Sequence, residues 1–459
     1  MELHARLRSF VPPSWRVALW GLLYYSSIFL IKVGMFACAW RERPAFGGLS
    51  FKTCLALAQT FGYASGKIPS LVYSPKLPEE QLRGALMAVI VAAGTAVTLS
   101  TFAPPGLSLV LVAMACFALA PAWSILMRFL EGRRDTEAVV AIVSFSYIGC
   151  SGLCKGITVD LVVVGFSDAE AVATCAVAGT ALGLLAAERV AAQPPPSEAD
   201  IEKRGRRKQM TNYRAEGGQL AREFGLGLAL CVSAYTLLGS LRAYRDYFQL
   251  ELFMAVGLSG QGASLFATSE FTISVVVLAS TACFGLVEDN RRALRLILWV
   301  AAGGGVGLAG FTALHGQGWI GGLAWMVCLG ASAFLAYVPL GCMLYERLLG
   351  AAREQMTSAL LNLLADACVL VGTAILLCYK DFYISASESE ADASVQSLHA
   401  RAAQDYAFFA KSCWTCGFVI AALLLLANWS LERNLDARLR ARDRGGAPGK
   451  LSTGELHRV

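Results

Sequence analysis

Two apolar stretches, far apart in the chain, carry a tyrosine and a basic residue at the same spacing. Tyr25 precedes Lys32 by seven residues in LYYSSIFLIKVGMF. Tyr235 precedes Arg242 by seven residues in SAYTLLGSLRAYRDYF. Seven residues are about two helical turns, so each phenol shares a helix face with its cation. A cation inside a membrane-length helix costs at least ~2.5 kcal/mol unless it meets water, a partner or a ligand. The matched pair therefore predicts one shared central site.

Other polar side chains interrupt the apolar segments at comparable depth. They are Gln59, Lys155, Glu270, Asn362 and Asp366. Three cations at bilayer depth attract an anion, and an arginine presents a planar fork to phosphate or carboxylate oxygens. We expect Lys32 and Arg242 to clamp an anionic group, with Lys155 assisting. The side chains expected to supply orienting hydrogen bonds are Tyr25, Tyr235, Gln59 and Asn362.

The intramembrane carboxylates leave two interpretations open. Glu270 and Asp366 either carry a coupling proton or compensate the cations while the site is empty. A structural interpretation also stands for every buried ion, in which each cation pairs with a carboxylate and holds helices in register while the substrate binds elsewhere.

Further charged residues are predicted to act in gating. They are Lys67, Arg133, Arg134, Arg245 and Asp246. Lys67 falls near the inner end of its helix, where its stem can reach the cytoplasmic surface. Arg133 and Arg134 belong to MRFLEGRRDTE, which serves either as a latch between helices or as anchoring charge on the cytoplasmic side.

The composition of the chain is that of a multi-pass membrane protein. Of 459 residues, 56% are hydrophobic and 16% charged, and the mean hydropathy is +0.55, whereas a soluble chain of this length needs far more polar surface. We predict an all-α membrane protein whose twelve spans form two pseudo-symmetric six-helix halves. The predicted spans are 17–39, 51–73, 84–103, 107–127, 138–164, 169–187, 224–248, 262–287, 293–314, 319–343, 356–379 and 406–429.

Polar segments divide the chain into an N-terminal half (1–187), a cytoplasmic linker (188–222), a C-terminal half (223–430) and a basic tail (431–459). Basic residues collect in the segments on one side, so both termini and the linker are expected in the cytoplasm. The basic cluster at 203–208 either binds anionic lipid or is a solvated linker. We expect the acidic loop at 380–405 to be mobile and the tail to be partly disordered.

Enzymatic activity is not expected. No nucleophile, metal or cofactor constellation stands out, and the spacing of Cys413 and Cys416 falls at a helix entrance without a soluble domain around it. We predict no cofactor, no metal and no nucleic-acid partner. The expected partners are a small anionic solute and the lipid bilayer, and a monomer is expected.

The chain resembles the major facilitator superfamily over nearly its whole length. The stretch 62–83, GYASGKIPSLVYSPKLPEEQLR, is similar to the loop after the second helix in the organophosphate:phosphate antiporter branch, with Gly66 separating Ser65 from Lys67. In that branch one basic residue on the first helix and one on the seventh bind the substrate phosphate. The resemblance implies alternating access and assigns those positions to Lys32 and Arg242.

A nearer resemblance is to an uncharacterised family of MFS-like membrane proteins. The motifs that carry it are Ser65-Gly66-Lys67, Leu130-Glu131-Gly132-Arg133-Arg134, Ser151-Gly152-Leu153-Cys154-Lys155 and Arg242-Ala243-Tyr244-Arg245-Asp246. That family supports the fold and implies no substrate.

The predicted function is transport of a small organic anion, a phosphate ester or a carboxylate, by exchange or by proton coupling. One alternative is transport of a neutral or sugar-like solute, with the buried ions paired internally. Another is a transporter-like receptor or scaffold that does not turn over.

Overall fold

The structure is a computed structural model that describes residues 13–40, 43, 49–130, 139, 142–143, 145–194, 213–258, 263–352, 359–388 and 398–444. The regular structure of these residues is helical. Helices that are both long and apolar enough to cross a membrane number nine within the described ranges. The prediction of an all-α membrane protein is therefore confirmed.

The N-terminal half contains seven α-helices and three 3-10 turns in the described residues. They are α2 (Pro13–Lys32), η1 (Gly34–Phe36), α3 (Phe51–Tyr73), η2 (Ser74–Lys76), α4 (Glu79–Phe102), α5 (Pro105–Leu119), α6 (Ala122–Leu130), η3 (Phe145–Tyr147), α8 (Gly149–Val164) and α9 (Asp168–Ala191).

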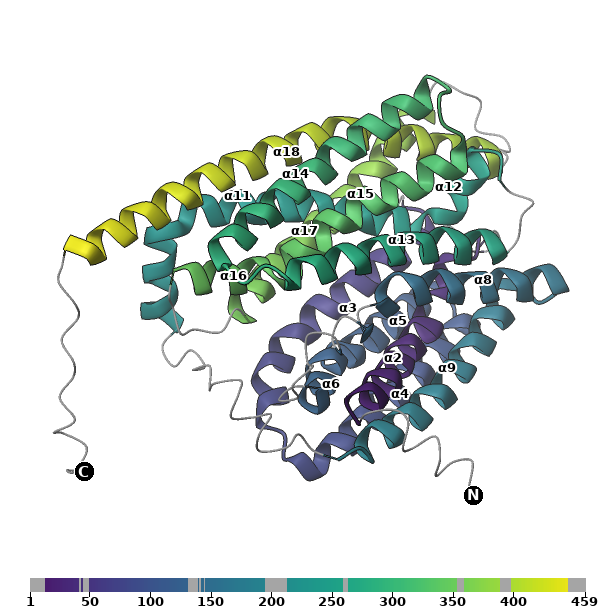
Figure 1. Cartoon of the computed structure of the whole chain (residues 1–459). Helices are drawn as coiled ribbons and strands as arrows, with labels where there is room; N and C mark the ends of the chain where they lie inside the picture. Colours follow the sequence, from purple (N-terminus) through teal and green to yellow (C-terminus); the bar gives the residue numbers. More distant parts are fainter. Residues whose placement is uncertain are drawn as a thin grey trace.

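The C-terminal half lies beside it, above it in Figure 1. Its helices are α11 (Tyr213–Tyr247), α12 (Gln249–Ala255), α13 (Ala263–Gly285), α14 (Asn290–Gly316), α15 (Gly322–Cys342), α16 (Leu344–Ala351), α17 (Ala359–Glu388) and α18 (Leu398–Arg444). Of the nine candidate spans in the described residues, three lie in the N-terminal half, where α5 and α6 together form one span, and six lie in the C-terminal half.

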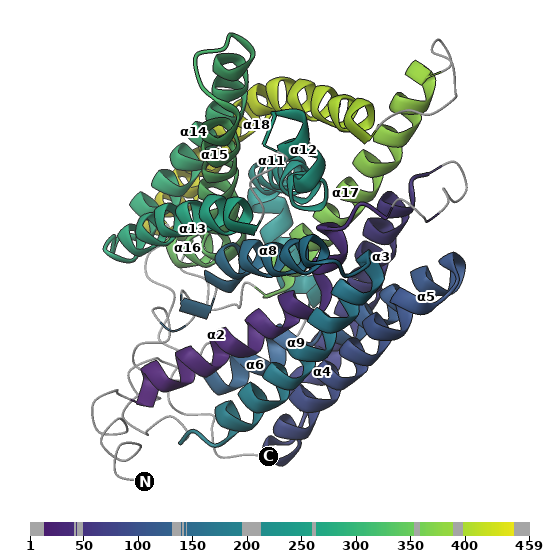
Figure 2. The same ribbon diagram turned by 90° about the vertical axis from the view of Figure 1, so that its right-hand side faces the viewer.

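Both ends of the bundle can be defined without reference to membrane sidedness. We call the end at which α2 begins and α18 finishes the terminal end, and the end at which α3 begins and α11 finishes the far end. Figure 2 shows α8 of the N-terminal half lying beside α13 of the C-terminal half.

Local sequence signals fix where several helices start. Ser50 caps α3 by accepting a hydrogen bond from the Thr53 amide. Ser167 and Glu170 form a capping box at the start of α9, and the Asp289 carboxylate accepts hydrogen bonds from the first amides of α14. Those amide hydrogen bonds lower the pKa of Asp289. Such caps satisfy backbone donors that lack a helical partner.

Two helices are longer than their predicted spans. The segment 380–388, expected in a mobile loop, continues α17 to Glu388, and α18 starts at Leu398. At its other end α18 runs on to Arg444, so the expectation of disorder is wrong for 431–444. There Glu432 pairs with Arg291 of α14, and Arg438 binds Glu223 of α11 at 2.7 Å. Leucine, alanine and arginine are strong helix formers, so helix continues where hydropathy has ended.

The halves meet closely where α8 runs along α13. A Cβ added at Gly152 would lie 2.5 Å from the Glu270 Cβ and 2.6 Å from the Phe266 carbonyl oxygen. Only glycine permits this approach, which is the packing role that small residues have between membrane helices.

We predict that Gly152→Ala destabilises the protein by about 1–3 kcal/mol, because the rigid Phe266 carbonyl cannot move aside and the helices must separate. Thermal unfolding of the purified protein in detergent measures the change. Gly84→Ala is the control, since nothing lies within 4 Å of a Cβ at that exposed position. Equal melting temperatures for Gly152→Ala and the parent would contradict the close contact.

Candidate functional site

One buried ion pair lies entirely within the C-terminal half. Arg245 on α11 donates to Glu270 on α13 at 2.6 Å, and their side chains are 2% and 5% exposed. Gln249 on α12 donates to the same Glu270 oxygen at 2.7 Å. Arg245, predicted near the outer surface as a gating residue, is thus enclosed beside Glu270.

Lys155 joins the two halves. Its ammonium on α8 donates to Asp246 Oδ1 at 2.5 Å, to the Asp246 carbonyl oxygen at 2.6 Å and to Gln249 Oε1 at 2.9 Å. The lysine side chain is 1% exposed, whereas the Asp246 side chain is 31% exposed. Asp246 therefore borders open space on the side away from Lys155.

A second ion pair between the halves lies toward the terminal end. Lys67, late in α3, pairs with Asp366, early in α17. Tyr235 on α11 donates to the other oxygen of Asp366 at 3.3 Å. Rather than extending to the membrane surface, Lys67 reaches across to the opposite half. Asn362 precedes Asp366 by one helical turn on α17.

Lys32 and Arg242 differ from these cations. Neither has an ion-pair partner within 4 Å among the described residues, and both rest on aromatic rings. Lys32 Nζ lies 4.6 Å from the centroid of Tyr63 and 5.3 Å from that of Phe29. The Arg242 guanidinium lies 4.7 Å from Tyr337. Its Nε is buried without a hydrogen-bond partner in the described structure.

The aromatic surroundings of the two cations correspond between the halves. Tyr25, two turns before Lys32, packs edge-on against Trp123 on α6 at 5.2 Å. Tyr235, two turns before Arg242, stacks on Tyr337 of α15 at 4.6 Å. The fourth span contributes in one half and the tenth in the other, so the repeat seen in sequence extends to the neighbouring helices.

Asp246 is the carboxylate that these cations share. It interacts electrostatically with Lys155, Arg242 and Lys32, and Lys32 in turn interacts with Arg242. Three cations therefore surround one acid, because Glu270 and Asp366 are engaged by Arg245 and Lys67. Within the described residues the centre of the bundle carries an excess of positive charge.

The remaining predicted residues lie at different distances from this centre. Gln59 on α3 donates to the Tyr247 hydroxyl at 3.0 Å, while its Oε1 is buried without a hydrogen-bond partner in the part of the chain described. Tyr247 packs on Phe36 at 4.6 Å, close to the far end. Arg133, Arg134 and the cluster at 203–208 lie outside the described residues.

Sequence reasoning missed a buried ionic cluster at the far end. Lys52, the second residue of α3, donates to both oxygens of Glu251 on α12 at 2.6 and 2.8 Å. Lys380 lies 2.7 Å from Asp381 and 3.2 Å from Asp405. Lys52 and Glu251 lie in the first turns of their helices, where a charge ordinarily faces water. Lys380, Asp381 and Asp405 lie in the segment 380–405, which the sequence predicts to be a loop.

The far-end cluster also connects the halves. The Ser50 amide donates to Asp381 on α17 at 2.7 Å. Lys380 stands 4.0 Å from the ring centroid of Phe248, and Lys52 stands 5.7 Å from it. Together with the Lys155–Asp246 pair, these contacts link the two halves.

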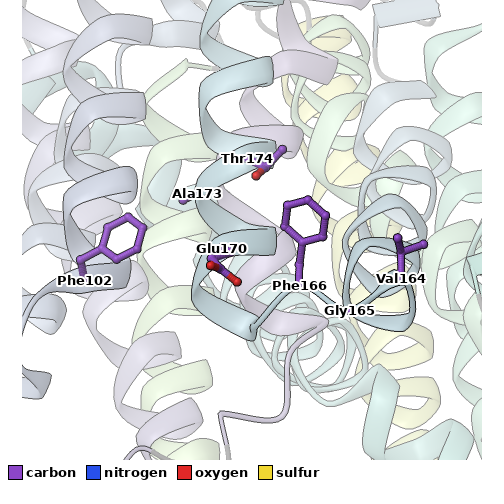
Figure 3. Close-up of a pocket in the computed structure, with 7 residues that line it drawn as sticks. All are labelled: Phe102, Val164, Gly165, Phe166, Glu170, Ala173 and Thr174. Atoms are coloured by element: carbon purple, nitrogen blue, oxygen red, sulfur yellow. The ribbon is translucent and has the colours of Figure 1, made fainter.

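A pocket of about 460 Å³ opens at the far end of the N-terminal half. Phe102, Glu170 and Phe166 line it, as Figure 3 shows. It contains none of the residues predicted from sequence, and it lies where α4 and α8 end and α9 begins. We do not assign substrate binding to it.

The fold matches solved structures of the major facilitator type. A D-xylose–proton symporter is 12% identical, with a TM-score of 0.59, covering 89% of this chain and 96% of its own. The nucleoside transporter NupG is 13% identical, with a TM-score of 0.56 and coverage of 90% and 99%. A bacterial homologue of the human lysosomal transporter Spinster, inward-facing and unoccupied, is 15% identical, with a TM-score of 0.55 and coverage of 94% and 98%.

The chain is thus an integral multi-pass membrane protein with the major facilitator fold. It belongs to a family described as being of unknown function (DUF5690), whose model matches residues 35–410. No curated protein matches the sequence. The predicted major facilitator fold is confirmed, and the likeness to the organophosphate:phosphate antiporter branch stays a prediction. The match to a family without an assigned function adds no substrate.

The Arg245–Glu270 pair yields a stability prediction. Removing either partner leaves a charge enclosed without compensation, so Arg245→Met or Glu270→Gln alone should destabilise the protein by about 3–5 kcal/mol. Thermal unfolding in detergent compares them with the double variant Arg245→Met/Glu270→Met. The double variant should be more stable than Arg245→Met alone. Additive losses would show that the two side chains do not depend on each other.

Proposed function

We propose that this protein transports a small organic anion by alternating access. The observation that carries the proposal is the pair of cations, Lys32 from one half and Arg242 from the other, neither of which has an ion-pair partner within 4 Å among the described residues. Leaving two such charges on aromatic rings is costly in a membrane unless water or a ligand meets them. An anion that enters from water supplies the missing partner.

The chemistry of the two cations favours a phosphate ester or a carboxylate. A guanidinium offers two parallel donors to two oxygens of one group, and an ammonium adds a compact point charge. Tyr25 and Tyr235 stand on the same sides of their helices as these cations and would orient the rest of the solute. Gln59 and Asn362 are further candidates for hydrogen bonds to it.

The two carboxylates take different parts in this proposal. Glu270 is enclosed with Arg245, which suits charge compensation. Asp366 is 36% exposed and binds Lys67 of the other half and Tyr235 of its own half, and it is our candidate for the coupling group. The contacts between the halves, at Lys155 and in the far-end cluster, are those that would break when access changes sides.

A neutral solute is the second candidate. The solved transporters with this fold include ones named for nucleosides and D-xylose. In that case Lys32 and Arg242 would have a structural role, held by the rings of Tyr63 and Tyr337.

Ligand-dependent thermal stabilisation of the purified protein separates the two candidates. A ligand present at 100 times its dissociation constant should add about 2.7 kcal/mol of stability. We expect phosphate esters, phosphate or carboxylates to stabilise the parent, and Lys32→Gln and Arg242→Gln to abolish the effect. Transport of the stabilising compound into proteoliposomes then tests turnover.

The matched controls remove the same charges from exposed positions. Lys76→Gln and Arg292→Gln should retain the stabilisation by anions. If only sugars or nucleosides stabilise the protein, or if Lys32→Gln and Arg242→Gln respond as the parent does, the proposal of an anion substrate is wrong.

A further inference from the structure

Asp246 occupies a particular place among the charges of the central site. It faces cations from both halves, namely Lys155 on α8, Lys32 at the end of α2 and Arg242 one turn earlier on its own helix. Lys155 is almost fully enclosed, but the Asp246 side chain is 31% exposed. A carboxylate that is both bound to a buried cation and open on its other side can leave without disturbing the helix that carries it.

The contacts of Lys155 show that the cation would stay in place. Its ammonium also donates to the Asp246 backbone carbonyl at 2.6 Å and to Gln249 Oε1 at 2.9 Å. Gln249 is held in turn by its hydrogen bond to Glu270. The Asp246 carboxylate is therefore the one exchangeable contact of three, and removing it exposes a positioned donor.

We infer that Asp246 is a built-in counter-anion that holds the site while it is empty and that the carboxylate or phosphate group of the substrate displaces. The inference rests on the proposed anion transport and deepens it by naming what the substrate competes with. Exchange of one anionic oxygen for another conserves the charge around Lys155, Lys32 and Arg242. The site then never presents three uncompensated cations to the membrane interior.

Displacement of the Asp246 carboxylate by substrate would also change the contact between α8 and α11. Ser151, one turn before Lys155, lies 3.4 Å from the same Asp246 oxygen, so the carboxylate contacts α8 through two side chains. When substrate replaces it, those side-chain links between α11 and α8 are lost. The contact between α8 and α11 is therefore weakened only when an anion is bound.

The test compares Asp246→Asn, which removes the competing charge and keeps an oxygen acceptor for Lys155, with Asp246→Glu, which keeps the charge. Calorimetric titration of the full-length protein in chloride-free detergent buffer uses inorganic phosphate and acetate as probes. We expect Asp246→Asn to bind at least one probe about tenfold or more tightly than the parent, and Asp246→Glu to bind no more tightly than the parent. Asp160→Asn, which removes an exposed carboxylate from the same helix as Lys155, should match the parent.

The outcomes distinguish this inference from the function on which it rests. If Lys32→Gln and Arg242→Gln abolish probe binding while Asp246→Asn leaves the affinity unchanged or lower, anion binding stands and Asp246 is not its competitor. Binding that appears only in Asp246→Asn supports the inference. If no variant binds either probe, both the anion site and the competing role of Asp246 are overturned.

Discussion

A charge enclosed between membrane helices needs an opposite charge, a hydrogen-bonding group or water beside it, and the arrangement of this chain follows from that requirement. Arg245 meets it within one half, through Glu270. Lys155 and Lys67 meet it across the two halves, so their ion pairs also decide how the halves are held. Lys32 and Arg242 meet it only in part, because an aromatic face is a weak substitute for an anion.

The two halves carry corresponding pairs of a tyrosine and a basic residue on their first helices. In each half the basic residue lies two turns from a tyrosine, and that tyrosine packs on an aromatic ring of the half's own fourth span. Two equivalent helices therefore present equivalent surfaces to one central space. The acidic partner is not duplicated, since Asp246 comes from α11 alone. Each half thus supplies one of these cations, but only the C-terminal half supplies the acid, which is why we propose that Asp246 controls the state of the site.

The sequence was sufficient to predict the all-α membrane fold and the helices that carry Lys32 and Arg242, because these depend on local composition. It did not predict the pairing. Lys67 and Asp366 are 299 residues apart, and Lys52 and Glu251 are 199 residues apart, so no local pattern connects them. Helix ends were also misjudged at Glu388 and Arg444, because hydropathy reports contact with lipid while helix formation depends on backbone propensity.

The length of α18 has a consequence for how motion in this protein would be observed. At 47 residues the helix is about 70 Å long, more than twice the ~30 Å hydrocarbon thickness. Its projecting part is tied through Glu432 and Arg438 to helices of its own half. This part of α18 is therefore held rigidly against the C-terminal half. If the C-terminal half rocks, the end of α18 near Arg444 moves further than the part inside the bundle. A small rotation inside the bilayer would therefore give a larger, measurable displacement outside it.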